Sequence, residues 1–179
     1  MNNREEMLSL LIAWENLPLM ITDLLAEPRK IEILMDLAIN SSHPKSWRAA
    51  WIADKIHDIN PGLIVPYIEK MIVQLKKETS SSKKREFLKL ISLHDFPKKY
   101  NSFLMDYCLN SFMSAEEPVA VRVHAMQILY HISESVPEFR PELLAVIEHE
   151  TELHSSAGIR SRAKRLATML LKDMKEERQ

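Results

Sequence analysis

The residues best suited to chemistry are seven histidines and one cysteine, and their spacing decides what they could do. His149 and His154 are five residues apart, so on a helix they point about 140° apart and do not converge on one metal ion. His124 and His131 share a helix face but lie about 10 Å apart along it, too far for one ion without ligands from other helices. The spacing therefore predicts structural or exposed histidines and no bound metal.

Cys108 is the only cysteine, so an internal disulfide and a paired-cysteine zinc site are excluded, which fits a reducing compartment. A thiol enzyme would need His94 as a base and Asp95 to orient it, if the fold brought them to Cys108. The surrounding sequence, FLMDYCLNSF, is instead typical of a buried and inert thiol. We therefore expect no catalytic residues and no cofactor, and the sequence favours a binding protein over an enzyme.

The composition restricts the fold further. The chain of 179 residues is 46% hydrophobic and 27% charged, which is typical of a globular protein, but it contains only two glycines. Nucleotide-binding loops and tight hairpin turns need more glycine than this, so Rossmann, P-loop, kinase and β-sandwich folds are excluded. No apolar run reaches the roughly 18 to 20 residues of a membrane span, and the N-terminal segment lacks the basic start of an export signal. These features predict a cytoplasmic protein with no membrane association.

An arginine recurs in a fixed setting: a Pro, Ser or Gly, then three residues, then Arg, then an apolar run with helical spacing. The arginines are 37, 37 and 40 residues apart, and the four units are Pro44 to Arg48, Ser81 to Arg85, Pro118 to Arg122 and Gly158 to Arg162. A second proline follows the first three arginines after 13, 12 and 15 residues, at Pro61, Pro97 and Pro137. The pattern predicts repeated pairs of helices, with Pro44 starting a helix.

This period resembles the HEAT and armadillo repeats, in which pairs of helices stack side by side. The resemblance implies an all-α fold, a right-handed α-α superhelix of about nine or ten helices. The expected organisation is a single domain with N-terminal cap helices in 1–40, helical pairs in 41–79, 80–115 and 116–154, and a C-terminal capping helix in 155–179. The cap helices are expected near 3–14, 17–26 and 28–40.

The resemblance also implies a structural role for three of the arginines. Arg48, Arg85 and Arg122 match the family's repeated arginine, which would form a ladder of hydrogen bonds to a carboxylate or to helix-end carbonyls of the neighbouring repeat. Trp47 and Trp51 lie four residues apart and so share one helix face. If Trp51 fills a buried interface, Trp51→Ala should cost about 3 to 5 kcal/mol, whereas an exposed ring would favour a binding role.

The function expected from this architecture is a noncatalytic scaffold that binds an unidentified protein or peptide, as a monomer or weak dimer. Net charge is −1, divided into blocks of −3, +5, −7 and +4 over residues 1–60, 61–100, 101–152 and 153–179. The alternative is a nucleic-acid-binding protein similar to HEAT-like alkylpurine DNA glycosylases, favoured by the basic blocks and opposed by the acidic one between them. The candidate partner-binding residues are Trp47, Trp51, Lys83, Lys84, Arg160, Arg162 and Arg165.

Overall fold

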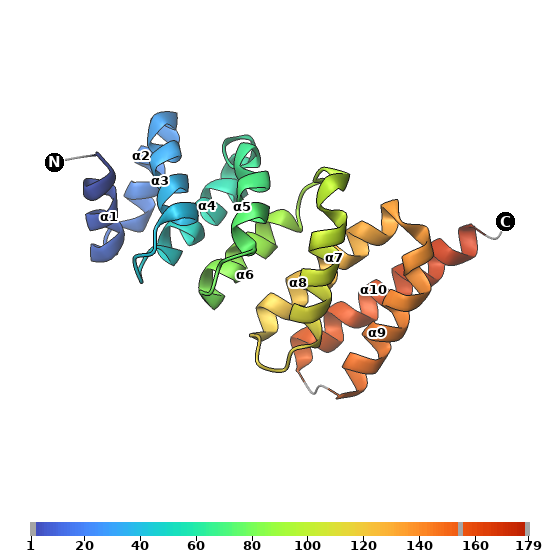
Figure 1. Ribbon diagram of the computed structural model, residues 1–179. Helices are drawn as coiled ribbons and strands as arrows, with labels where there is room; N and C mark the ends of the chain where they lie inside the picture. Colours follow the sequence, from blue (N-terminus) through green and yellow to red (C-terminus); the bar gives the residue numbers. More distant parts are fainter. Residues whose placement is uncertain (1–2, 154–155, 178–179) are drawn as a thin grey trace. The chain divides into compact units, whose positions relative to one another are not determined.

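The protein is described by a computed structural model that covers residues 3–153 and 156–177, and these residues contain helices and no strands (Figure 1). The expected all-α class and the expected number of helices are confirmed in this part of the chain. Its ten α-helices are α1 (Asn3–Ala13), α2 (Leu17–Ala26), α3 (Pro28–Asn40), α4 (Trp47–Ile59), α5 (Ile68–Leu75), α6 (Ser81–Ile91), α7 (Asn101–Met113), α8 (Val119–Ser135), α9 (Arg140–Leu153) and α10 (Ala157–Glu176).

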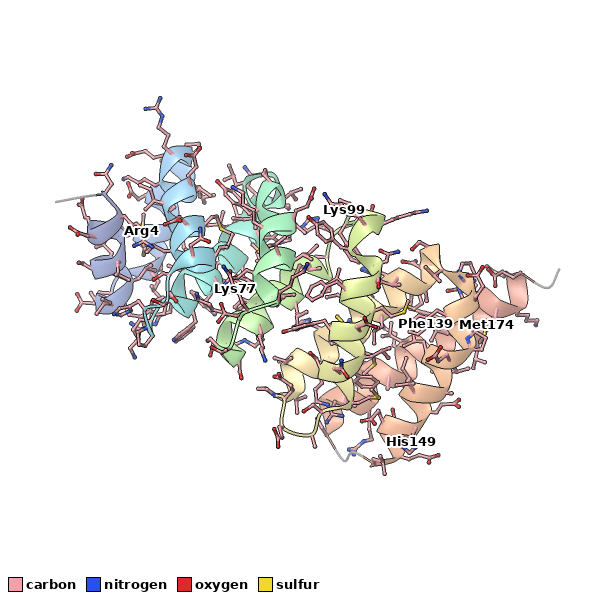
Figure 2. All side chains as sticks on the ribbon, viewed as in Figure 1. Arg4, Lys77, Lys99, Phe139, His149 and Met174 are labelled. Carbon is pink, nitrogen blue, oxygen red and sulfur yellow. The ribbon has the colours of Figure 1, made fainter. Side chains whose placement is uncertain are left out.

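The helices group into two compact units, Met1–Leu90 and Ile91–Gln179, and the boundary falls near the end of α6. In the first unit, α3 packs against α1, α2, α4 and α5. Arg4 of α1 reinforces this packing, because its Nε lies 2.7 Å from a carboxylate oxygen of Asp36 on α3 (Figure 2). In the second unit, α8 is central and packs against α7, α9 and α10. The single domain with three helical pairs stays a prediction, although α4 with α5 and α8 with α9 fall within the expected ranges.

The second set of prolines marks the entry to α5, α7 and α9. Pro61 starts a short 3-10 helix, Pro61–Leu63, which is followed by another, Val65–Tyr67, and then by α5. Pro97 precedes the 3-10 helix Lys98–Tyr100 before α7, and Pro137 starts Pro137–Phe139 before α9. Proline fits these positions because its fixed φ suits a first helical turn and its missing N–H would have no partner there.

The residue four positions before each repeated arginine has a different place relative to its helix in each repeat. Pro44 does not start α4 directly, because a turn occupies residues 44–46 and the α-helix begins at Trp47. Pro118 caps α8 from the position before Val119, and Ser81 is the first residue of α6. The expectation that Pro44 begins the helix was therefore wrong by three residues, since Ser46 and the turn before it provide the entry instead.

The core of each unit is built from the apolar stripes of these helices. Fully buried side chains include Leu34, Met35, Ile52 and Phe87 in the first unit, and the second unit buries Leu104, Phe112, Val121, Leu129 and Leu166. Burying such side chains supplies the main favourable term in folding. None of the helices in the described residues is long and apolar enough to span a bilayer.

Candidate functional site

Three tryptophans meet in the first unit, at the junction of α1 and α4. Trp14 follows α1, whereas Trp47 and Trp51 are the expected pair one helical turn apart on α4. The Trp14 ring centroid lies 5.9 Å from that of Trp47 and 5.3 Å from that of Trp51, in tilted and edge-on geometries. All three rings are half-buried, so each keeps part of its surface open to solvent. We call these three residues the tryptophan cluster.

Two cations border the tryptophan cluster. The guanidinium carbon of Arg48 lies 4.8 Å from the Trp14 ring centroid and 5.7 Å from that of Trp47. The ammonium of Lys55 lies 5.3 Å from the Trp51 centroid. Cations over indole faces are attracted by the ring quadrupole, most strongly when water is partly excluded. The cluster therefore combines large apolar surface with fixed positive charge.

Trp14 is held in an unusual backbone conformation, with φ of 57°. A bulky side chain in the left-handed region costs about 1 to 2 kcal/mol, and the contacts of Trp14 with two rings and a guanidinium offset that cost. Sequence reasoning did not single out Trp14, because only Trp47 and Trp51 share a helical spacing. No local signal in the sequence brings the residue after α1 onto the face of α4.

Two of the three ladder arginines reach a neighbouring helix. Arg48 Nη1 donates to the carbonyls of Leu11 and Ile12 at the end of α1, each at 2.9 Å. Arg122, which is 3% exposed, donates from Nε to the Phe112 carbonyl of α7 at 2.7 Å and from Nη2 to Glu150 of α9 at 3.0 Å. The acceptors are helix-end carbonyls in one case and a carbonyl plus a carboxylate in the other, and the ladder of repeated arginines stays a prediction.

Arg85 does not follow this pattern. Its side chain is 40% exposed and pairs with Glu86, the next residue of the same helix, whose carboxylate is almost fully buried. The strong demand of a buried carboxylate for a charged donor explains why Arg85 turns toward its own helix. The spacing of the arginines does not reveal this difference.

The basic candidates are distributed over different environments. Lys83 is only 3% exposed, so its ammonium cannot meet a flat partner surface, and Lys84 is half-buried. On α10, Arg160 and Arg165 are exposed, whereas Arg162 is half-buried and donates to Gln127 of α8. Counting charges along the sequence could not separate these cases, because burial depends on which helices pack nearby.

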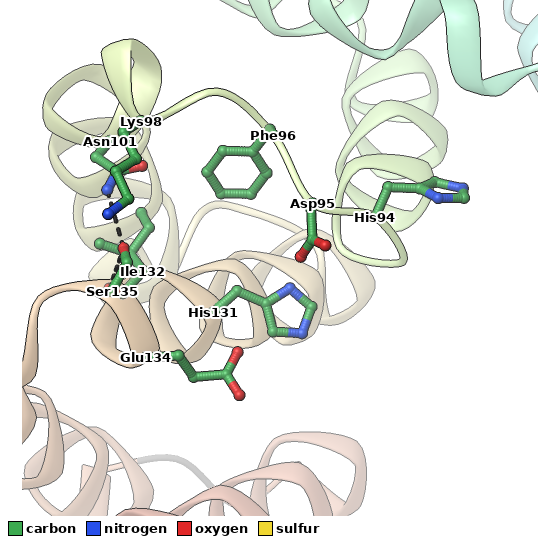
Figure 3. A pocket seen from close by; sticks show the side chains of 9 residues that line it. All are labelled: His94, Asp95, Phe96, Lys98, Asn101, His131, Ile132, Glu134 and Ser135. Atoms are coloured by element: carbon green, nitrogen blue, oxygen red, sulfur yellow. Dashed lines mark hydrogen bonds between the residues drawn. The ribbon is translucent and has the colours of Figure 1, made fainter.

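A pocket of about 320 Å³ in the second unit lies between residues 94–98, α7 and the end of α8 (Figure 3). His131 stands at one end, with the carboxylates of Asp95 and Glu134 on either side of its ring, while Lys98 and Asn101 lie at the other end. Asn101 donates to Ser135 Oγ at 3.1 Å across that end. The pocket therefore has an acidic and a basic end.

Gln127 fixes the protonation state of His131. Arg162 and Arg165 both donate to Gln127 Oε1, and Gln127 Nε2 lies 3.1 Å from His131 Nε2. Because guanidinium groups only donate, the amide must present its oxygen to them and its N–H to the imidazole. His131 Nε2 is then an acceptor and its ring is neutral. Since this nitrogen is occupied, it is not free to act as a general base toward the pocket.

The pH dependence of stability follows from this arrangement. Burial lowers the pKa of His131 below its usual value, although Glu134 and Asp95 oppose the shift. The unfolded chain binds a proton at a higher pH than the folded one, so the stability from neutral His131 is present above about pH 6.5 and is lost as pH falls below it. We expect the free energy of unfolding to decrease from pH 7 to pH 5, as measured by urea denaturation.

His131→Gln should remove this part of the pH dependence. His149→Asn, at an exposed position of the same unit, should leave it intact (Figure 2). An equal loss of the pH dependence in both variants would contradict the assignment to His131.

Cys108 is fully buried on α7, and burial raises the pKa of its thiol far above its usual value. His94 and Asp95 line the pocket around His131, and Cys108 is not among the residues that line it. The structure therefore does not assemble the hypothetical thiol site. Within residues 3–153 and 156–177, no group of three or more His, Cys, Asp or Glu side chains is placed to hold a metal ion. His154, considered above with His149, lies outside the described residues.

Comparison with known proteins identifies the repeat. A family model described as a HEAT repeat domain matches residues 4–170, nearly the whole chain. No curated protein matches the sequence, and no solved structure matches it. The match extends into both compact units and includes all four repeated arginines, in agreement with the resemblance drawn from their spacing. The chain therefore belongs to the HEAT repeat family.

Proposed function

We propose that the chain is a noncatalytic protein-binding scaffold, and that its partner docks on the tryptophan cluster. Repeat scaffolds of paired helices present extended surfaces for partners, which supports the general role. The observation that carries the proposal is the group of three half-buried tryptophans bordered by Arg48 and Lys55. Tryptophan and arginine are enriched among the few interface residues that supply most of the binding energy.

The geometry indicates which part of a partner would bind there. The three indoles supply rigid apolar surface at little cost in side-chain entropy, so an apolar or aromatic side chain of the partner would pack best against their exposed parts. Arg48 and Lys55 already contact ring faces and protein oxygens, including the Lys55 contact of 3.0 Å with Asp54. Their positive charge would favour carboxylates of the partner at the rim of the interface. Charges at an interface rim affect the association rate more than the affinity.

A matched pair of variants tests the proposal. Trp51→Gln removes an indole from the cluster, and Tyr67→Gln removes a ring of the same unit that also lies 5.3 Å from a lysine ammonium, that of Lys70. We expect a partner captured stoichiometrically from native lysate by the unaltered chain to be retained by Tyr67→Gln and reduced at least tenfold for Trp51→Gln, about 1.4 kcal/mol or more. Equal retention by both variants, measured by quantitative mass spectrometry, would count against this surface.

Stability measurements separate binding from packing. Because Trp51 is half-buried, we expect Trp51→Gln to cost less than the roughly 3 to 5 kcal/mol of a fully buried tryptophan. The variant should therefore stay folded, with an unchanged helical circular dichroism spectrum. A decrease of about 3 to 5 kcal/mol in the free energy of unfolding would place Trp51 in the core and remove it from the proposed surface.

The nucleic-acid alternative has weaker support. Lys83 is buried and Arg162 is half-buried and engaged with Gln127, so neither side chain is exposed on a face along which a nucleic-acid backbone could run. The exposed Arg160 and Lys164 share a shallow groove with Glu148 and Glu152 of α9, whose charges would repel phosphates. We expect no salt-dependent shift of DNA or RNA in gel titrations, whereas an affinity that falls steeply with salt would favour this alternative.

A further inference from the structure

A second pocket, of about 400 Å³, lies in the first unit between the turn before α4 and the start of α6. It does not include the tryptophan cluster, so an inference from it stands apart from the proposed partner surface. All of its lining residues except Pro44 have polar side chains, among them Ser41, His43, Lys77, Glu78, Ser80 and Lys83.

Glu78 is the one carboxylate that lines this pocket, and its oxygens are already occupied. Oε1 accepts the backbone N–H groups of Thr79 and Ser80, at 3.0 and 2.9 Å. Oε2 accepts from Gln74 Nε2 at 3.3 Å and lies 3.6 Å from Lys83 Nζ. The backbone N–H groups of Thr79 and Ser80, just before α6, are therefore already bonded to Glu78.

Lys83 is a buried cation, and one of the three N–H donors of its ammonium has no acceptor assigned to it. Its ammonium has three N–H donors. One donates to the Ser41 carbonyl at 2.7 Å, and a second is directed toward Glu78. Burial lowers the pKa of Lys83, although Glu78 opposes the shift, so an added anion near Nζ would stabilise the charged form. Lys77, exposed at the rim, supplies a second positive charge.

Three further groups of the pocket are left with a hydrogen to donate. Ser41 Oγ accepts from the His43 N–H at 3.2 Å, and Ser80 Oγ accepts from the Lys83 N–H at 3.4 Å, so the hydroxyl hydrogens of both serines remain for another acceptor. His43 Nδ1 accepts from the Lys45 N–H at 3.1 Å, which places the hydrogen of the neutral ring on Nε2. The pocket thus offers several unused donors, and its two lysines outnumber its one carboxylate.

We propose that this pocket binds a phosphate group, held by Lys83, Lys77, the Nε2–H of His43 and the hydroxyls of Ser41 and Ser80. These donors come from two chain segments, which suits a tetrahedral oxyanion with acceptors pointing in several directions better than a planar carboxylate. The phosphate could belong to a free small molecule or to a phosphorylated side chain, and both have the same recognition chemistry.

The test is an NMR titration of the full chain with inorganic phosphate and, separately, with a short phosphoserine peptide. We expect saturable shifts of the backbone amides of residues 41–46 and 79–83 with either probe, at concentrations up to about 10 mM. Tighter binding of the peptide would identify a phosphorylated side chain as the source, and tighter binding of inorganic phosphate would identify a free ligand.

Variants decide whether the shifts report the proposed site. Lys77→Gln, at an exposed position, should weaken binding at least threefold, and Lys83→Met should abolish it if the variant folds. Lys45→Gln removes an exposed lysine from the same turn that does not line the pocket, and it should bind like the unaltered chain. Absence of saturable shifts at residues 41–46, or equal weakening by Lys45→Gln and Lys77→Gln, would overturn the proposal.

Discussion

Arg122→Met is expected to destabilise the protein by about 3 to 5 kcal/mol, because it breaks a buried and hydrogen-bonded ion pair. Arg122 and Glu150 are 3% and 5% exposed, and their side chains meet at 3.0 Å between α8 and α9. The substitution also removes the donor to the Phe112 carbonyl, which ties the end of α7 to α8. Urea denaturation of the purified variant measures the loss.

A second substitution separates two contributions to the loss of stability, the broken buried ion pair and the lost packing of the Arg122 side chain. In Arg122→Met with Glu150→Leu, both charges are absent, so much of the stability should return. Arg85→Met is the matched control, because Arg85 occupies the equivalent position in the preceding sequence repeat but is 40% exposed and bonds within its own helix. We expect Arg85→Met to cost less than Arg122→Met. Equal costs for the two arginine substitutions would contradict the different roles that we assign to them.

Phe87→Ala should have an effect of similar size in the first unit, about 3 to 5 kcal/mol. Phe87 of α6 has no solvent exposure, so truncation removes its buried surface and leaves a cavity that the surrounding helices fill only in part. Val73→Ala serves as the control, since Val73 of α5 is 48% exposed and little of its side chain is removed from contact. A loss below about 1 kcal/mol for Phe87→Ala would mean that the first unit repacks more easily than its burial indicates.

The architecture was predictable because it depends on local and repeated signals. Helix starts at Pro28 and Val119, the latter after Pro118, follow from the fixed φ of proline. The 37-residue spacing of Arg48, Arg85 and Arg122 marks α4, α6 and α8. Family membership over residues 4–170 agrees with that spacing. Such features can be predicted from the spacing of residues and from the backbone preference of each residue type, and both can be read from one sequence.

The candidate site was less predictable because it depends on contacts between distant segments. Trp14 joins Trp47 across 33 residues of chain and does so through a left-handed backbone that no rule assigns to tryptophan. Lys83 and Lys84 are neighbours in sequence, yet the packing of α6 buries the first much more than the second. Gln127, which determines the state of His131, has no distinguishing signal in the sequence at all.

The most direct test of the scaffold account is photo-crosslinking in cells from position 51, with p-benzoylphenylalanine in place of Trp51 and, in a control chain, in place of Tyr67. The account predicts a discrete covalent adduct with one protein from position 51 and none from position 67. Identical adducts from both positions, or no adduct from position 51, would contradict a partner surface at the tryptophan cluster.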